Sequence, residues 1–385
     1  MSKVNLPFRL PAPREGRVDL LVVAAEHSGD EHAARAVRAL CGRRPGVVVA
    51  ALGGPQLAQA GAQLLHDLTA GSVLGLGEVL KRYSFFRALI AEVVRWVGEY
   101  RPHAVCFVDS SGLNLRIARG LFEQGFSAKA GGPTRAVYYI SPQLWASRAR
   151  RRFAMAKHLD SLAAIFPFEP KVYADTPLPV EFVGHPFVAP DYAPPVRYDP
   201  AGPVLLLPGS RPSAVARIFP VLLEAFRAAT PGREAVVLYP GETVLTALRA
   251  AGPPEEVKLV AVGGGAEPQA ASAVLTSSGT MSLHCALAGI PGAITYRTDG
   301  LTYWLGRLLV KVEYLGIANL LLGEPMYPEF IQGAARPADL ARELRACLEN
   351  GARREDTRRQ SERLHALLRQ PAGATVGDWL ERQLT

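Results

Sequence analysis

Two short segments in the second half of the chain combine the residue types that bind phosphate groups. In one, small residues at 278–280 follow an apolar run and precede a helical pattern. A strand, a tight turn and a helix N-terminus present unpaired backbone N–H groups and a helix dipole to a ligand. In the other, an apolar run ends in Gly209, Ser210 and Arg211, and an arginine can donate two hydrogen bonds to phosphate oxygens. Either turn alone is compatible with simple helix–sheet packing, but the pair predicts a ligand that carries a diphosphate.

One acidic residue in the first half is placed where it could do chemistry. Asp109 directly follows the apolar run 104–108, which is typical of a buried parallel strand. The carboxyl end of such a strand points into the ligand crevice of an open α/β sheet, where a carboxylate can act as a general base. The same side chain could instead cap the helix that starts near Leu113. The residues alone leave both roles open.

Length and composition limit the class of protein. The 385 residues, 49% of them hydrophobic, are enough for two domains with separate cores. The net charge of +8 is concentrated in residues 1–170. This indicates nucleic acid, an acidic membrane or a phosphorylated substrate as partner, or only a solvated basic surface. The four cysteines are too far apart for a metal site, and no apolar run is long enough to span a bilayer. We expect a soluble or peripheral protein without a metal.

The alternation of apolar runs and helical patterns predicts an α/β fold of two Rossmann-like, doubly wound domains. The expected strands lie at residues 19–25, 47–52, 104–108, 136–140, 162–166, 180–183, 204–207, 235–238, 257–262, 271–275 and 293–296. The first strand is not followed by G-x-G-x-x-G, so no dinucleotide cofactor is expected.

The domain boundaries follow from composition. Residues 1–186 form the first domain, and the Pro-rich residues 187–203 form a linker. Residues 204–360 form the second domain, and residues 361–385 form a charged helical tail. We expect the last segment of the tail, from about Thr375, to return to the first domain.

An apolar and aromatic segment lies beside basic residues in the first half. It contains Leu74, Leu76, Val79, Phe85 and Phe86. Such a combination is typical of an element that binds the surface of a membrane. A core helix with a basic outer end explains the pattern equally well.

Several motifs, taken in order, resemble the lipid-A-disaccharide synthase family from about residue 18 to 370. In the first half, the similar segments are G-E-T-S-G-D at 25–30, G-P-x-M at 54–57, M-G-I-x-E-V-L at 74–80, I-D-A-P-D-F-N at 108–114 and Y-V-S-P-S-V-W-A at 139–146. Further along, they are L-P-F-E at 166–169, F-V-G-H-P at 182–186, L-L-P-G-S-R at 206–211, A-S-G-T-x-x-L-E at 277–284 and P-N-L-L-A-G at 318–323. Two Rossmann-like halves with phosphate-binding turns in the second also describe a GT-B glycosyltransferase, whose domains face a cleft.

The resemblance implies an inverting hexosyltransferase without metal or cofactor. It would join UDP-2,3-diacylglucosamine to 2,3-diacylglucosamine 1-phosphate, giving the lipid A disaccharide and UDP. Asp109 would be the base, with Glu26 beside it in the crevice. The donor would be bound by Gly209, Ser210, Arg211, Ser278, Gly279, Thr280, His284, Asn319 and Gln332. The acceptor would be bound by Ser28, Gly29, Asp30, Ser141, Trp145 and His185.

The same resemblance implies a peripheral protein at the inner face of the cytoplasmic membrane, with residues 74–86 at the bilayer surface, and it allows a homodimer. Nucleic acid is not an expected partner, because no module that binds it is present.

Three departures from the family pattern bear on activity. Gly112 replaces the second Asp of I-D-A-P-D-F-N, Ala214 replaces the acid after P-G-S-R, and His284 replaces the glutamate after S-G-T. A neutral imidazole offers a ribose one acceptor where a carboxylate offers several. Two alternatives therefore remain. One is another sugar-nucleotide enzyme on the GT-B fold, either a transferase with a different donor or lipid acceptor or a non-hydrolysing epimerase. The other is a degenerate homologue that binds lipid or a partner without catalysis.

Overall fold

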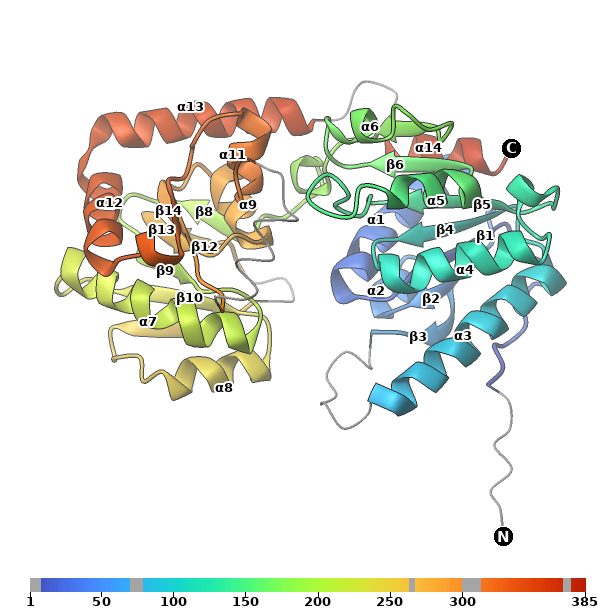
Figure 1. Cartoon of the computed structure of the whole chain (residues 1–385), viewed down its shortest axis with the longest axis horizontal. Helices are drawn as coiled ribbons and strands as arrows, with labels where there is room; N and C mark the ends of the chain where they lie inside the picture. Colours follow the sequence, from blue (N-terminus) through green and yellow to red (C-terminus); the bar gives the residue numbers. More distant parts are fainter. Residues whose placement is uncertain (1–7, 70–78, 263–266, 300–312, 370–374) are drawn as a thin grey trace, which may run out of the picture. The chain divides into compact units, whose positions relative to one another are not determined.

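The computed structural model of the chain describes residues 8–69, 79–262, 267–299, 313–369 and 375–385. It divides into two compact units (Figure 1). The N-terminal unit contains residues 1–186 and 370–385, and the C-terminal unit contains residues 187–369. Each unit has its own parallel sheet, so the α/β prediction is confirmed.

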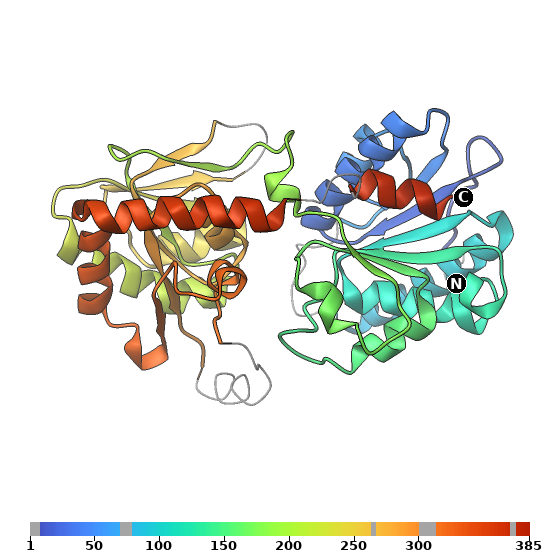
Figure 2. The same ribbon diagram turned by 90° about the horizontal axis from the view of Figure 1, so that it is seen from above.

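The N-terminal unit is built on a parallel sheet of seven strands in the order β3-β2-β1-β4-β5-β6-β7. Its elements are β1 (Leu20–Ala24), α1 (His27–Arg43), β2 (Val49–Gly53), α2 (Pro55–Gln59), β3 (Gln63–Asp67), α3 (Val79–Tyr100), β4 (Ala104–Val108), α4 (Ser111–Glu123), η2 (Ala128–Ala130), β5 (Arg135–Tyr139), α5 (Arg151–His158), β6 (Ser161–Ala164), α6 (Glu169–Val172), β7 (Val180–Phe182) and α14 (Val376–Gln383). The short η3 (Pro186–Val188) lies at the boundary of the two units. Every residue of β1 and of β4 is buried, because helices cover both faces of the sheet (Figure 2).

The C-terminal unit repeats this architecture with six parallel strands in the order β11-β10-β9-β13-β14-β15. Its elements are β8 (Val196–Tyr198), β9 (Val204–Leu207), α7 (Pro212–Ala229), β10 (Ala235–Tyr239), α8 (Glu242–Ala250), β11 (Val257–Ala261), β12 (Gln269–Ala271), β13 (Ala273–Thr276), α9 (Thr280–Leu287), β14 (Gly292–Tyr296), α11 (Ile317–Leu322), β15 (Glu329–Ile331), η4 (Gln332–Ala334), α12 (Pro337–Glu349) and α13 (Gly351–Leu368). The apolar side of α7, including Ile218, Phe219 and Leu222, is buried in the core of this unit.

Both sheets contain a topological switch point, which is a pair of neighbouring strands from which the strand order continues in opposite directions. It lies between β1 and β4 in the N-terminal unit and between β9 and β13 in the C-terminal unit. Ligands of open α/β sheets bind outside the carboxyl ends of the strands at such points. The order of the strands therefore fixes where each unit can hold a ligand.

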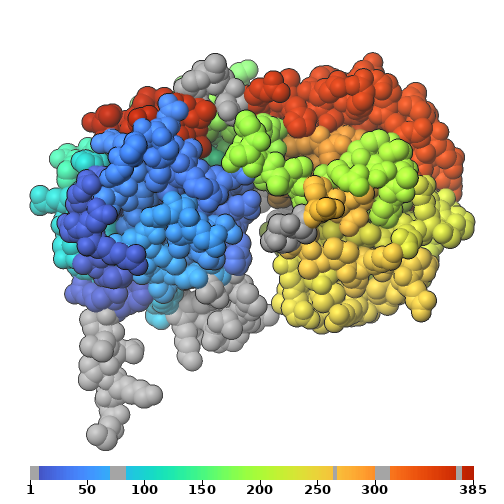
Figure 3. Space-filling view, turned by 180° about the vertical axis from the view of Figure 1, so that it is seen from behind, coloured from blue at the N-terminus to red at the C-terminus, as the bar shows by residue number. Residues whose placement is uncertain are grey.

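The end of the chain returns to the N-terminal unit, as expected from the sequence. Helix α14 packs against α1 (Figures 2 and 3). A capping box between Thr375 and Asp378 starts the helix. Trp379 is buried, and its indole N–H donates to Ser161 Oγ at 2.9 Å. A buried indole with a satisfied N–H fixes the helix firmly on this unit.

Two boundaries differ from those expected. The segment expected to be a linker contains β8, which pairs in parallel with β12 and so belongs to the C-terminal unit. The segment expected to be one helical tail is split, because α13 runs on from residue 351 in the C-terminal unit while α14 belongs to the other unit. Among the described residues, no helix is both long enough and apolar enough to cross a membrane.

Candidate active site

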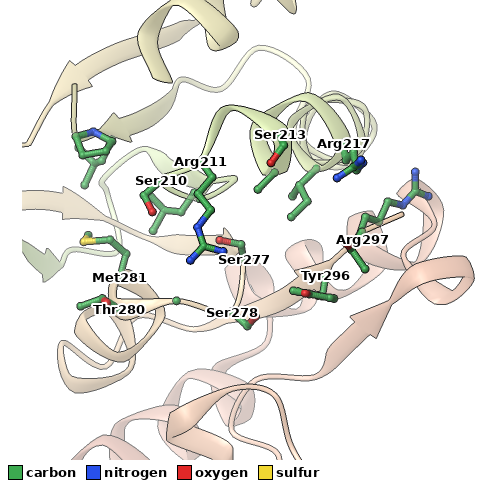
Figure 4. Close-up of a pocket in the computed structure, with 18 of the residues that line it drawn as sticks. Ser210, Arg211, Ser213, Arg217, Ser277, Ser278, Thr280, Met281, Tyr296 and Arg297 are labelled. Carbon is green, nitrogen blue, oxygen red and sulfur yellow. The ribbon is translucent and has the colours of Figure 1, made fainter. Parts of the chain in front are cut away.

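A pocket of about 510 Å³ lies at the switch point of the C-terminal sheet (Figure 4). Both segments with phosphate-binding residue types line it, because they follow β9 and β13, which are hydrogen-bonded neighbours. From the first segment come Gly209, Ser210 and Arg211, and from the second Ser278, Gly279 and Thr280. The structure thus brings together two segments that are far apart in the sequence.

The turns leave backbone groups free for a ligand. Gly209 has φ +117°, a conformation that favours glycine, and a β carbon there would lie 3.2 Å from Ser277 Oγ. Helix α9 begins after Gly279 without a side-chain cap and without an acidic residue in its first turn. Its first N–H groups and its dipole are therefore available to an anion.

The charge of the pocket is positive. Arg211, Arg217 and Arg297 line it, and among the described residues that line it none is acidic. Arg211 extends across the pocket toward Ser277 (Figure 4), and it makes no ion pair with any residue that the structure describes. Arg297 donates to the backbone oxygen of Ala335 at 2.6 Å. Guanidinium groups without acidic partners, next to a helix N-terminus, suit a phosphate or diphosphate.

Asn319 and Gln332, expected to contact the donor, have internal partners instead. The Asn319 amide donates to Tyr327 O at 2.7 Å and to Glu329 Oε1 at 2.9 Å, and its oxygen accepts from Tyr327 N at 2.9 Å. Gln332 accepts from Thr298 N at 2.9 Å and donates to Thr298 O at 3.1 Å. Thr298 lines the pocket, so Gln332 holds its wall. Asn319 is fully buried and connects α11 to β15.

His284 is also placed differently from the expected ribose contact. It does not line the pocket but is buried, with 6% of its surface exposed. Its ring stacks on Phe187 with centroids 3.9 Å apart, and its Nε2 lies 3.3 Å from the Tyr192 hydroxyl. An imidazole packs against aromatic rings where a carboxylate would have to be desolvated. The histidine therefore suits this aromatic cluster.

The other candidate residues lie at the switch point of the N-terminal sheet. Asp109 follows β4, Glu26 follows β1, and these two strands are paired in parallel. Asp109 and Ser110 have φ +49° and +38°, values that are unfavourable for residues other than glycine. Strain of this kind persists where the surrounding structure enforces it, often at functional sites. The left-handed backbone turns the chain sharply between β4 and α4.

The carbonyl group of Asp109 is held by two side chains from the fold. The Asn114 amide donates to it at 2.9 Å and to Val108 O at 3.1 Å, and the Tyr138 hydroxyl also donates to it. Asn114 is fully buried, and so is Tyr138. These bonds use the backbone oxygen and leave the carboxylate free. They explain how a strained residue is kept in one orientation.

The surroundings of Asp109 suit a base better than a helix cap. No side-chain cap hydrogen bond is formed at the start of α4. Burial raises the pKa of Asp109, the charge of Glu26 raises it further, and the backbone N–H of Ser110 lowers it. Glu26 is exposed and accepts from Ser110 Oγ at 3.2 Å. A carboxylate with a raised pKa is a stronger proton acceptor than an ordinary aspartate.

Residues 28–30 differ in whether they could contact a ligand or instead stabilise the fold. Ser28 is exposed in the first turn of α1, and a β carbon on Gly29 would lie 3.9 Å from that of Asp109. Asp30 is an exception to the expected contact with the acceptor. It is buried, and its carboxylate accepts from Gly54 N at 2.8 Å and Gln56 N at 3.0 Å at the start of α2. Its acceptors are used by the backbone.

The other predicted acceptor residues contact aromatic side chains. Ser141 Oγ lies 2.7 Å from the Tyr173 hydroxyl, and the ring of His185 lies 5.2 Å from that of Phe166. Trp145 packs edge-on against Phe168 with centroids 5.4 Å apart. Ser141 and His185 are buried, whereas Trp145 is half-buried. Of the three, only Trp145 keeps substantial surface for a ligand.

Glu169 is buried next to Phe166 and Trp145, and its chemistry was not expected from the sequence. Its Oε2 accepts from Phe166 N at 3.1 Å and Ile165 N at 3.2 Å, while its Oε1 is buried without a partner of normal geometry. Burial raises its pKa to about 8, although those two N–H groups and the indole N–H of Trp145 lower it. Glu169 is therefore largely protonated at neutral pH.

Replacing Glu169 by glutamine is expected to stabilise the protein at alkaline pH only. The folded state holds the proton up to about pH 8, whereas a glutamate of ordinary pKa releases it near 4.5. The free energy of unfolding of the wild type should therefore fall as the pH rises from about 4.5 to about 8. Urea unfolding at pH 5 and pH 8.5 measures this. An equal difference between Glu169→Gln and wild type at both pH values would contradict the assignment, and Glu123→Gln on the exposed face of α4 is the control.

Comparison with known proteins decides the family. The family model described as lipid-A-disaccharide synthetase matches residues 20–375. The lipid-A-disaccharide synthase of Anaeromyxobacter dehalogenans is 36% identical over 350 residues, which cover 87% of this chain and 89% of that protein. That of Nitrosococcus oceani is 34% identical over 348 residues, covering 87% and 88%. The chain belongs to the lipid-A-disaccharide synthase family. The resemblance seen in the motifs is thereby confirmed, as is a glycosyltransferase of lipid A synthesis.

Solved structures confirm the GT-B fold of this synthase family member. The calicheamicin glycosyltransferase CalG4 superposes with a TM-score of 0.54, at 15% identity, over 96% of this chain and 98% of that one. A UDP-GlcNAc 2-epimerase from Neisseria meningitidis, bound to UDP-GlcNAc, superposes with a TM-score of 0.58 at 11% identity, over 93% and 96%. Transferases and epimerases share this fold, so the sequence relatives, not the fold, decide between them.

The other two departures from the synthase pattern are compatible with the fold. Ala214 lines the pocket of the C-terminal unit, and without an acid at this position none of the described lining residues carries a negative charge. A β carbon on Gly112 would meet nothing within 4 Å. A side chain there would extend into solvent on the first turn of α4, so its loss leaves no cavity.

The residues expected to face a membrane are described only in part. Leu74 and Leu76 lie outside the described residues, as does the side chain of Val79. Phe85 is 37% exposed and lies within 6 Å of the rings of Phe8, His66 and Phe86. Phe86 packs partly against the core of the N-terminal unit. Of the described pair, Phe85 is therefore the more accessible.

Proposed function

We propose that the chain transfers the sugar of UDP-2,3-diacylglucosamine to 2,3-diacylglucosamine 1-phosphate with inversion, the reaction implied by its family. The observation that supports it most is the placement of the Asp109 carboxylate. It is held by a strained backbone at the switch point of the first sheet, and its pKa is raised. A transfer of this type needs one base at the acceptor and one site for the departing diphosphate. The two units supply one each.

The C-terminal unit binds the UDP part of the donor in this proposal. Arg211 and the N–H groups at the start of α9 bind the diphosphate, and the same groups stabilise the negative charge that develops as UDP leaves. Preorganised donors of this kind need no metal. Gln332 acts indirectly, because it fixes Thr298 in the pocket wall.

The N-terminal unit binds the acceptor, and Asp109 accepts the proton of the attacking hydroxyl. The oxygen attacks the anomeric carbon from the face opposite to UDP, and so the configuration is inverted. Glu26 tunes the base through its charge, and Trp145 offers a half-buried aromatic surface to the acceptor. Because the acceptor carries acyl chains, we further propose that the protein works at the inner face of the cytoplasmic membrane, with residues 74–86 at the bilayer.

The replacement Glu26→Gln is expected to lower the apparent pKa of the base. The charge of Glu26 raises the pKa of Asp109, so its removal should move the acid limb of the kcat/KM profile to lower pH. Initial rates from pH 4.5 to 9 in mixed micelles measure this. An acid limb that stays in place would mean that Asp109 is not the titrating base. Glu31→Gln, an exposed change further along α1, is the control.

A single-turnover assay tests the proposed reaction as a whole. Purified protein is mixed with both lipid substrates in neutral mixed micelles, and the release of UDP is followed. Release that requires the acceptor and yields a disaccharide supports the proposal. Light scattering of the same sample determines whether the chain forms the homodimer that the resemblance allows.

The placement of His284 favours a second candidate, a synthase-like enzyme with a different donor. The imidazole is buried among aromatic rings and away from the pocket, so the ribose contact expected of the family's glutamate has no counterpart there. Titration with UDP discriminates. Binding of UDP without turnover of UDP-2,3-diacylglucosamine would favour another sugar, and absence of binding would favour a homologue that has lost catalysis.

A further inference from the structure

A cluster of arginines before and at the start of α5 is not explained by the fold. Arg152 forms a bidentate ion pair with Asp175, with Nε–Oδ1 at 2.7 Å. By contrast, Arg148, Arg150 and Arg151 form no ion pair with any described part of the chain. Arg148 and Arg150 are exposed, and Arg151 is half-buried. Three guanidinium groups are thus left available on one short segment.

The positions of these arginines oppose the stability of the helix. Arg150 is the residue before α5, Arg151 is its first residue, and the first turn contains no acid. Positive charges are unfavourable at the positive end of a helix dipole, and neighbouring like charges repel each other. Arg148 in addition adopts φ +57°. Local folding therefore gives no reason for this concentration of charge, whereas an anionic ligand does.

The loop that carries the cluster begins beside Asp109. Strand β5 pairs with β4 so that Tyr139 is opposite Val108, and Asp109 N donates to Tyr139 O at 3.2 Å. The loop then leaves the carboxyl edge of the sheet, where the acceptor is proposed to bind (Figure 1). Leu144 is buried, and Trp145 packs against Phe168. The middle of the loop is therefore anchored, which fixes the path of the residues that follow.

An exposed aromatic ring adjoins the arginines. Phe153 has 50% of its surface exposed, and the guanidinium of Arg152 lies 4.4 Å from its ring centre. Phe153 thus places a large exposed apolar side chain on the same short segment as the arginines that lack ion pairs within the described chain. This combination suits an amphiphilic ligand, one that carries both a phosphate and hydrocarbon.

We propose that Arg148, Arg150 and Arg151 form the site that binds the phosphate monoester of the lipid acceptor. This inference rests on the proposed function, since the phosphate belongs to the proposed acceptor. Arginine forks bind a phosphate with several hydrogen bonds. Their position on the loop that begins beside Asp109 holds the acceptor at the base. Phe153 supports the adjoining apolar part of the lipid.

The test compares the double variant R150Q/R151Q with wild type on two acceptors. One is 2,3-diacylglucosamine 1-phosphate, and the other is the same lipid without its phosphate, both in neutral detergent micelles. The matched control is the double variant R116Q/R119Q. It removes two positive charges from exposed positions of α4, elsewhere on the same unit. Thermal unfolding is measured for all three proteins.

The variant should raise the KM for the phosphorylated acceptor by about tenfold or more, with kcat, the donor KM and folding little changed. For the acceptor without phosphate, the variant and wild type should have the same KM, which is already high. An equal rise for both acceptors would overturn the proposal, because the residues would then not recognise the phosphate. No rise for either acceptor would overturn it as well.

A second experiment distinguishes recognition of the acceptor phosphate from binding to anionic membrane lipids. Sedimentation with phosphatidylcholine vesicles that contain phosphatidylglycerol measures binding to the membrane surface. A variant that loses vesicle binding but keeps its acceptor KM in neutral micelles would assign the arginines to lipid headgroups and overturn the proposal. If wild type releases no UDP, the proposed reaction fails. Binding of both acceptors to both proteins in neutral micelles without donor then decides the phosphate site alone.

Discussion

Replacing Asp109 by asparagine is expected to lower kcat by about 1,000-fold, the range of general base catalysis. Asparagine has the shape of aspartate but cannot accept the proton of the attacking hydroxyl. It also tolerates the left-handed backbone at φ +49° better than other residues except glycine. The hydrogen bonds from Asn114 and Tyr138 reach the backbone oxygen, so they remain. Single-turnover release of UDP with saturating acceptor measures the effect.

Stability and UDP affinity serve as the checks on this variant. Burial and Glu26 disfavour the charged form of Asp109, so the neutral amide should leave the melting temperature at pH 8 equal or higher. The proposed UDP site lies on the other unit, so the affinity for UDP should be unchanged. Asp160→Asn is the matched control, because burial also raises the pKa of Asp160. This residue precedes β6 and so lies at the amino ends of the strands, whereas Asp109 lies at their carboxyl ends. Near-normal turnover by Asp109→Asn would show that another group is the base.

The sequence was most informative for elements whose position in the fold depends on hydrophobicity alone. Strands such as β1 and β4 are buried on both faces, so their apolar runs could be recognised from the residues alone. Strands β3 and β15 were missed, because both are partly exposed and β15 has only three residues. The places of Asp109 and of the two pocket-lining turns at the strand ends could be predicted, since each follows a recognisable strand.

Polar residues of the motifs were harder to interpret, because their role depends on partners distant in the sequence. Asn319 and Asp30 were expected to contact ligands, yet their polar atoms bind backbone groups of Tyr327 and Gly54. The rings that surround His284 are separated from it by more than ninety residues. Asn114, which holds Asp109, was overlooked. Its position on the buried face of an apolar helix was a usable signal, because a buried amide needs a partner.

Replacing Arg211 by glutamine is expected to lower kcat/KM for the donor by about 100- to 1,000-fold, the effect of removing one preorganised donor from a developing anion. UDP should also bind more weakly, by about tenfold or more, since a charge-assisted bidentate contact is lost. Arg211 precedes α7, and within the described chain its side chain makes no ion pair, while its backbone oxygen accepts from Ala214 N and Val215 N at 3.0 Å. The fold should therefore tolerate the change. UDP titration and donor kinetics measure the two effects separately.

Arg211→Lys distinguishes the fork from the charge. Lysine keeps the positive charge but cannot donate two parallel hydrogen bonds, so its kcat/KM should lie between those of wild type and Arg211→Gln. Arg227→Gln is the control, because it removes an exposed arginine from the last turn of α7, outside the pocket. A lysine variant equal to wild type would mean that Arg211 acts as a point charge. Unchanged UDP affinity in Arg211→Gln would leave Arg217 and the start of α9 as the diphosphate site, since both line the same pocket.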